Sequence, residues 1–416
     1  MENRHTIEEL KQWQSLPLNI KVRMTEERIR GWVHYFGEDG VYISFSGGKD
    51  STVLLHIARK LYPNIKAVFV DVPTQYPELK AFAERFDNVD ILRPKISFMQ
   101  VCDKYGFPLI SKEVSGAVYD AKKYLTRVKE ESSTLTDRQT DRQTVRGYWA
   151  FADVVGIPRR QEAKKSETYQ LLKKGVIPKE YEYLYKIGKE RGDVPVRCSM
   201  LFGELKHKEK GIETEEFSNR YNKSKYRFFL ESEFMLSDRC CKVMKKEPLH
   251  RYGRDTGRLP ITAQMAEESD LRASVWVRNG CNGFQMKSPI SNPMSFWTEN
   301  DVLEYIVKHD IEICSVYGDV VEDFGNEIEG QMHLSDFGYG EKVCKYKCTG
   351  CKRTGCVLCG YGANYESEQE SRFRKLKETH PKMYGLLDVI KNNGITFREA
   401  IEWTNDHMIG KGHIYL

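Results

Sequence analysis

The sequence has no apolar run of the roughly 18 residues that a membrane-spanning helix needs. Its first residues, MENRHTIEELKQWQ, are charged and do not form the basic stub and apolar core of a secretion signal. Net charge is small, because 65 lysines and arginines face 60 aspartates and glutamates. A net charge of +5 says little about nucleic-acid or membrane partners. These absences predict a cytoplasmic protein without a membrane partner.

Disulfide bonds are not expected either, although the chain contains eleven cysteines. Cytosolic thiols are kept reduced, so a cysteine-rich chain without a secretion signal more often uses its cysteines for a metal or a cluster. Five of the eleven are crowded between Cys344 and Cys359. The isolated Cys102, Cys198 and Cys314 are expected to be packing residues.

The pattern from residue 41 onward predicts a doubly wound parallel α/β sheet. Short apolar runs at 41–45, 66–72 and 89–94 are typical of buried strands, and the segments between them have helical spacing. Strands that alternate with helices form parallel sheets. The expected organisation is an N-terminal helical segment (1–38), a nucleotide-binding half (39–115), a helical basic insertion (116–227), a second part of the same domain (228–335), and a cysteine-rich loop with a helical tail (336–416).

The stretch between about residues 112 and 226 is rich in lysine and arginine, with aromatic residues between them. Such a strip suits a nucleic-acid backbone, but a solvated helical surface is the favoured interpretation. The repeat TDRQTDRQT at 136–144 predicts an exposed loop to which no chemistry is assigned.

A glycine turn between the first strand and its helix predicts a phosphate-binding loop, Ser46-Gly47-Gly48-Lys49-Asp50-Ser51. Phosphates need converging backbone amides near positive charge, which such a turn at a helix N-terminus supplies. The two serine hydroxyls are expected to donate to phosphate oxygens, and Lys49 to neutralise charge. Asp50 either orients the loop, approaches a metal-bound phosphate, or caps the helix. The loop is not a Walker motif, because G-x-x-x-x-G-K-[ST] does not occur.

The string S-G-G-x-D-S resembles the pyrophosphate loop of enzymes that cleave ATP between its α and β phosphates. VFVDVPTQYPEL, PITAQMAEESDLR and NPMSFWTENDVLEYI extend the resemblance to the phosphoadenosine phosphosulfate (PAPS) reductase family, of the adenine nucleotide alpha hydrolase-like superfamily. It covers roughly residues 40–115 and 228–365. It implies a nucleotide site of Ser44, Ser46, Gly47, Gly48, Lys49, Asp50, Ser51, Asp71, Glu267, Ser269 and Arg272, in which Lys49, Asp50 and Asp71 are catalytic.

The cysteines resemble those of the adenylylsulfate reductase branch, in which a cysteine pair and a C-x-x-C motif ligate a [4Fe-4S] cluster. Either Cys240 and Cys241 join Cys356 and Cys359, or one of the pair joins Cys351, Cys356 and Cys359. A tetrahedral Zn²⁺ site and redox thiols without metal remain alternatives.

Two departures bear on the reaction. Met265 stands where many sulfonucleotide reductases have an arginine, and no cysteine follows Cys359, whereas thioredoxin-linked reductases attack with a cysteine near the C-terminus. We therefore expect ATP and Mg²⁺, attack of an acceptor oxygen on the α-phosphorus, release of pyrophosphate, and iron-sulfur-dependent sulfur transfer. The expected partners are an adenine nucleotide, a nucleic acid or small-molecule acceptor, and a sulfur donor protein, with an oligomer possible. The alternatives are a sulfonucleotide reductase, or a nucleic-acid-binding component of a modification or defence complex with a structural cluster.

Overall fold

The computed structural model describes residues 4–133, 180–209, 212–323, 345–351, 354–408, 410 and 412–416. The repeat at 136–144 and Cys344 lie outside these residues. The chain divides into two compact units, unit 1 (Met1–Phe98 and Cys241–Val357) and unit 2 (Met99–Cys240 and Leu358–Leu416). Within the described ranges, no helix has the length and apolarity that a membrane crossing requires.

Unit 1 contains a six-stranded sheet in the order β3-β2-β1-β7-β9-β8. All neighbours in it pair in parallel except β8 and β9, which are antiparallel. The predicted parallel α/β sheet is therefore confirmed. Its strands are β1 (Val41–Ser44), β2 (Ala67–Val70), β3 (Val89–Leu92), β7 (Leu259–Ile261), β8 (Asn282–Gly283) and β9 (Ile290–Ser291), and a separate antiparallel pair joins β10 (Val320–Glu322) to β11 (Tyr346–Cys348).

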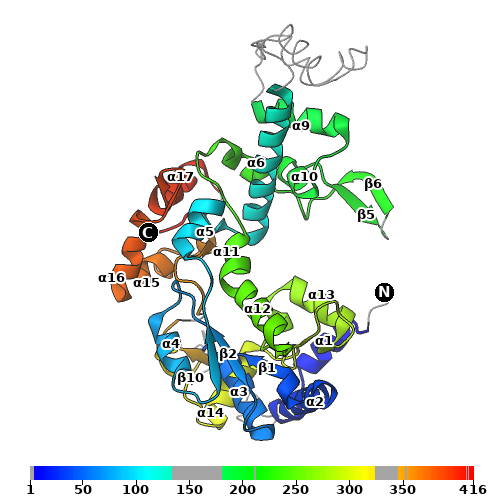
Figure 1. Cartoon of the computed structure of the whole chain (residues 1–416), viewed down its shortest axis with the longest axis vertical. Coiled ribbons are helices and arrows are strands. Elements are labelled where there is room, and N and C mark those ends of the chain that lie inside the picture. The colour runs from blue at the N-terminus through cyan, green and yellow to red at the C-terminus, as the bar shows by residue number, and fades with distance from the viewer. Residues whose placement is uncertain are drawn as a thin grey trace, which may run out of the picture. The chain divides into compact units, whose positions relative to one another are not determined.

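The helices of unit 1 pack around this sheet, and in Figure 1 α3 and α12 lie beside β1 and β2. They are α1 (Ile7–Gln14), α2 (Leu18–Phe36), α3 (Lys49–Leu61), α4 (Pro77–Ala83), α12 (Glu247–Thr256), α13 (Asp270–Asn279) and α14 (Glu299–Lys308). Apolar spacing explains α3, since Val53, Leu54 and Ile57 are all fully buried against the core that contains Ile43. Burial of this stripe fixes the rotation of α3 about its axis and so directs its first turn.

The described residues of unit 2 are mainly helical and include three short strand pairs. Its helices are α5 (Phe98–Tyr105), α6 (Lys112–Ser133), α9 (Glu180–Arg191), α10 (Val196–Phe202), α15 (Arg372–Thr379), α16 (Pro381–Tyr384) and α17 (Phe397–His407), and α11 (Arg239–Cys241) leads back into unit 1. β4 (Leu109–Ile110) pairs with β12 (Gly360–Tyr361), β5 (Lys206–Glu209) with β6 (Ile212–Phe217), and β13 (Lys391–Asn392) with β14 (Ile395–Thr396).

The β5-β6 hairpin lies in the stretch that the sequence predicted to be helical. The segment I-E-T-E-E-F has β-branched residues two positions apart, Ile212 and Thr214, as is typical of a strand. Lysine and glutamate dominate the flanking sequence and favour helices, so the helical signal outweighs this short strand pattern.

Candidate anion site at the start of α3

The predicted phosphate loop follows β1 directly and runs into the first turn of α3. Gly47 has a φ of +71°, and a Cβ on it would come within 3.1 Å of the Leu79 carbonyl oxygen. A side chain here would thus be strained by backbone conformation and would crowd the backbone of α4. Gly48 is the N-cap residue of α3 and makes no side-chain cap, so the helix start is left open for other oxygen atoms.

The two serines of the loop hold it together instead of pointing away from it. The Ser51 hydroxyl donates to the Gly48 carbonyl at 2.9 Å and accepts the Ser46 backbone amide at 3.1 Å. The Ser46 and Ser51 hydroxyl oxygens lie 3.0 Å apart. Ser44 closes β1, opposite Val68 of β2. The serines are therefore placed at the loop as predicted, with their hydroxyls engaged in local hydrogen bonds.

Lys49 is the cation of this site and is almost fully buried, with its side chain 5% exposed. Its Nζ lies 3.2 Å from Asp50 Oδ1 and 3.1 Å from Glu299 Oε1. Burial lowers the pKa of Lys49, but the charges of Asp50 and Glu299 outweigh burial, so the pKa is raised overall. The amine is thus charged, and its two carboxylate partners are more exposed than Lys49 itself.

The first backbone amide of α3 already has a partner. The Lys49 N–H donates to the Tyr317 phenol oxygen at 3.2 Å, and that oxygen lies 2.7 Å from Thr354 Oγ1. A Cβ on Gly48 would meet the same two oxygens at 3.1 Å and 3.3 Å. Burial raises the pKa of Tyr317, so its hydroxyl is neutral. Neutral hydroxyl oxygens thus occupy the helix N-terminus that anions ordinarily bind.

A cysteine-bearing segment adjoins the loop through Tyr317. Cys348 ends β11 opposite Val320 of β10, and the Gly350 amide donates to the Tyr317 carbonyl at 2.8 Å. Burial raises the pKa of the half-buried Cys348 thiol, and the charge of Lys49 acts in the opposite direction. The Cys351 thiol donates to the Tyr76 hydroxyl at 3.5 Å. Two thiols three positions apart therefore lie in the same unit as the phosphate loop and are tied to it.

Asp71 follows β2, at the edge of the sheet where β1 leads into the loop. Its carboxylate pairs with Lys80 Nζ at 3.4 Å and Arg93 Nε at 3.3 Å. Among the described contacts none links the Asp71 carboxylate to the loop, and its catalytic role stays a prediction.

The predicted residues of the 267–272 segment serve mainly to begin helices. The Glu267 carboxylate accepts the Glu299 backbone amide at 2.8 Å, which anchors the start of α14. Ser269 is the N-cap of α13 and accepts the Arg272 amide, while the Arg272 guanidinium pairs with Glu268. Glu267 thus reaches the loop indirectly, because the side chain of Glu299 pairs with Lys49.

The predicted metal ligands are divided between the units: Cys241, Cys351 and Cys356 belong to unit 1, and Cys240 and Cys359 to unit 2. In the part of the chain that the structure describes, no three His, Cys, Asp or Glu side chains are grouped so as to hold a metal ion. The cluster, its ligands and the zinc alternative remain predictions.

Sequence reasoning missed Glu299, Tyr317 and Thr354, and it considered Cys348 only as one of the crowded cysteines of a metal site. Glu299 follows Thr298, which the sequence marks as a helix cap, so its place at a helix start was foreseeable. Cys348 stands three residues before Cys351, a spacing that marks a thiol pair. Tyr317 and Thr354 carry no local signal, because their contacts with the loop join positions far apart in sequence.

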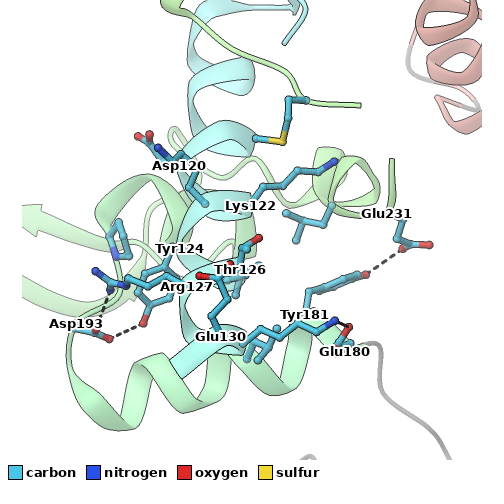
Figure 2. A pocket seen from close by; sticks show the side chains of 17 residues that line it. Asp120, Lys122, Tyr124, Thr126, Arg127, Glu130, Glu180, Tyr181, Asp193 and Glu231 are labelled. Carbon is cyan, nitrogen blue, oxygen red and sulfur yellow. Dashed lines mark hydrogen bonds and ion pairs between the residues drawn. The ribbon is translucent and has the colours of Figure 1, made fainter. Parts of the chain in front are cut away.

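A large pocket of about 1270 Å³ lies elsewhere, in unit 2, between α6, α9 and the chain around Glu231. Figure 2 shows Arg127 paired with Asp193 in this pocket. Lys129 pairs with Glu180 at 3.1 Å. Lys122 Nζ donates to Ser232 Oγ and to the carbonyls of Ser232 and Phe234, at 2.5–2.8 Å. The pocket contains none of the predicted site residues, and its size alone does not make it the reaction site.

The loop, its buried lysine and the parallel sheet together make a candidate anion site of the α/β class. The family model of the phosphoadenosine phosphosulfate reductase domain matches residues 40–183 and 196–361. The chain therefore belongs to the PAPS reductase family, as the sequence motifs predicted. Among solved structures, it is similar to a phosphoadenylyl-sulfate (PAPS) reductase from Candida auris, in a phosphate complex. That similarity has 11% identity and a TM-score of 0.31, and covers 85% of this chain and 100% of that chain. No curated protein matches the chain.

Proposed function

We propose that the protein binds ATP with its phosphates on the Ser46–Ser51 loop and catalyses attack of an acceptor oxygen on the α-phosphorus, which releases pyrophosphate. The observation that carries the proposal is the buried, charged Lys49 amine at the first turn of α3, held by carboxylates that a phosphate can replace. Charge develops on phosphate oxygens in such a transition state, and a fixed amine stabilises it.

Bound phosphates would replace the protein groups that now accept hydrogen bonds from the amide and the amine of Lys49. A phosphate oxygen takes the Lys49 amide from Tyr317 and the Lys49 amine from Glu299. Released from the amine, the carboxylates of Asp50 and Glu299 are oxygen ligands of the kind that Mg²⁺ prefers. Mg²⁺ would neutralise the charge of the leaving pyrophosphate. Gly47 and Gly48 let the phosphates approach the backbone closely.

The adenylated acceptor would receive sulfur in a following step. Family membership and the cysteine-rich segment support sulfur chemistry, with a nucleic acid or a small molecule as acceptor and a separate protein as sulfur donor. A [4Fe-4S] cluster on Cys240, Cys241, Cys356 and Cys359, or on a set that includes Cys351, is part of this proposal through the chemistry of four thiolates. Iron and acid-labile sulfide in the anaerobically purified protein test it, and zinc in their place would exclude it.

Reduction of a sulfonucleotide is the second candidate function. One observation favours it, namely that Cys348 ends a hairpin strand whose following Gly350 amide is bonded to Tyr317, the residue whose hydroxyl accepts the Lys49 amide. Family membership also supports this activity.

Product analysis separates the two functions. Anaerobically purified protein is incubated with ATP, or with adenylylsulfate and a dithiol, and pyrophosphate and sulfite are measured. Pyrophosphate supports the first function, and sulfite without pyrophosphate supports the second. Lys49→Met is expected to abolish either product. Lys60→Met, at the far end of the same helix, is the matched control and is expected to be active.

A further inference from the structure

We propose that Cys348 and Cys351 are the thiol pair that reduces a sulfonucleotide held on the phosphate loop, Cys348 attacking sulfur and Cys351 resolving the product. The inference rests on the second candidate function and names its nucleophile. The pair lies in the same unit as the loop.

The backbone of the pair is fixed against the segment that carries Tyr317. Three consecutive amides, of Thr349, Gly350 and Cys351, donate to the carbonyls of Asp319, Tyr317 and Val316 at 3.0, 2.8 and 2.8 Å. Because the Tyr317 hydroxyl accepts the first amide of α3, an unbroken series of hydrogen bonds connects the thiol pair to the phosphate loop.

Close packing removes the freedom to shift this segment. A Cβ on Gly350 would come within 2.5 Å of the Val316 carbonyl oxygen. Gly318, on the opposing strand end, has a φ of +64° and faces the Thr349 side chain. Only glycine permits this approach at either position. The pair is therefore built into the wall of the site and is not a mobile tail.

The two thiols have different surroundings, which assigns their roles. Cys348 ends β11, whose Tyr346 amide donates to Asn300 Oδ1 at 2.9 Å, so β11 is held beside Glu299, the partner of Lys49. A sulfate that takes the Lys49 amine from Glu299 therefore lies on the side of the loop where β11 is held. The Cys351 thiol donates to the Tyr76 hydroxyl at 3.5 Å. Cys348 is thus assigned as the attacking thiol and Cys351 as the resolving thiol.

The chemistry balances with one dithiol per turnover. The Cys348 thiolate attacks the sulfur of adenylylsulfate, the sulfur–oxygen bond to AMP breaks, and AMP leaves while an S-sulfonate forms on Cys348. The Cys351 thiolate then attacks the Cys348 sulfur, sulfite leaves with the electron pair, and a Cys348–Cys351 disulfide forms. An external dithiol reduces that disulfide and supplies the two electrons that sulfate has gained.

The test uses the full chain, purified anaerobically, with adenylylsulfate and a dithiol, and is repeated with the 3'-phosphorylated nucleotide. Cys348→Ser is expected to lose sulfite formation more than about 100-fold while it still binds the nucleotide, since the nucleophile and the binding groups are distinct. In a parallel reaction without the dithiol, Cys351→Ser is expected to release AMP once per chain and to retain an S-sulfonate on Cys348, read by peptide mass. Cys102→Ala, a buried thiol of unit 2, is the control and is expected to behave as wild type.

The outcomes distinguish failure of the thiol assignment from failure of the reductase function on which it rests. Sulfite formation at the wild-type rate by Cys348→Ser overturns the thiol assignment and leaves reduction standing. Absence of sulfite from the wild-type protein with bound adenylylsulfate overturns reduction itself, and the assignment with it. Loss of iron from Cys351→Ser also overturns the assignment, since a cluster ligand is not available as a resolving thiol. Unchanged iron supports it and favours Cys240, Cys241, Cys356 and Cys359 as the ligand set.

Discussion

Two lysine amines, Lys49 in unit 1 and Lys122 in unit 2, are held in opposite ways. Lys49 of unit 1 pairs with the carboxylates of Asp50 and Glu299, and its pKa is raised although burial lowers it. Lys122 of unit 2 donates to a hydroxyl and two backbone carbonyls, and burial lowers its pKa to about 8. Carboxylate side chains can turn toward solvent or Mg²⁺, whereas the carbonyls are part of the fold.

The comparison distinguishes a binding cation from a structural one. An anion that reaches Lys49 replaces partners that have alternatives, while an anion that reaches Lys122 would break the turn that contains Ser232 and Phe234. Burial and charge of the amine do not by themselves distinguish a binding lysine from a structural one. The groups that accept the amine's hydrogen bonds do distinguish them, and they favour an anion site in unit 1 over the pocket of unit 2.

The largest expected effect is on nucleotide affinity in Lys49→Met. Loss of a charge-assisted hydrogen bond of about 1.5 to 3 kcal/mol weakens binding roughly 10- to 100-fold. Isothermal titration with ATP measures the loss, and chemical denaturation of the same variant confirms that it remains folded. Wild-type affinity in this variant would remove Lys49 from the anion site.

In Lys122→Met we expect the reverse pattern, with lower stability and unchanged affinity. The substitution leaves buried acceptors without a donor, which lowers the free energy of unfolding by about 1 to 3 kcal/mol. Chemical denaturation measures this change, and ATP titration supplies the comparison. A large fall in ATP affinity without a fall in stability would make Lys122 a binding group and would erase the contrast between the units.

Tyr317→Phe tests whether the start of α3 is held closed by a hydroxyl. The variant keeps the ring and removes the oxygen that accepts the Lys49 amide. Because phosphate no longer competes with that hydrogen bond of about 1 kcal/mol, affinity for ATP is expected to rise about fivefold. Thr349→Val, which alters the same hairpin without touching the amide of α3, is the control. Weaker ATP binding in Tyr317→Phe would mean that the hydroxyl assists the nucleotide.

The smallest effect is expected for Glu299→Gln. Removal of one of the two carboxylates on Lys49 strengthens inorganic phosphate binding about two- to fourfold without Mg²⁺, because exposed ion pairs contribute less than about 1 kcal/mol. Glu304→Gln, on the same helix and paired with Lys308, is the matched control. With Mg²⁺ present the gain in Glu299→Gln should disappear or reverse, and persistence of the gain would argue against Glu299 as a metal ligand.

The sequence predicted the local parts of this site and missed the distant ones. The loop from Ser46 to Ser51 was recognisable because its glycines, its lysine and its flanking strand and helix are contiguous. Asp71 was placed correctly at a strand end, yet its ion pairs with Lys80 and Arg93 depend on helix and strand positions that periodicity does not specify. Tyr317 could not be predicted as a partner of the Lys49 amide, because 268 positions separate the two.

The β10-β11 hairpin adds a further lesson about prediction. C-x-x-C spacing at Cys348 was visible in the sequence, but the crowding of five cysteines favoured metal ligation as its explanation. The structure adds what spacing lacks, namely the amides of Thr349 to Cys351 that fix the pair beside Tyr317. Local sequence thus identifies the reactive residue types, and long-range hydrogen bonds decide which of them meet.

The hydrogen bond between Tyr317 and the Lys49 amide also has a thermodynamic consequence. It belongs at once to the phosphate loop and to the hairpin that carries Cys348 and Cys351. A nucleotide that breaks this bond changes the free energy of the hairpin, and linkage requires the reverse effect to be equal. Nucleotide binding should therefore shift the midpoint potential of the Cys348–Cys351 pair. The free energy of this shift equals the free energy by which oxidation of the pair changes nucleotide affinity.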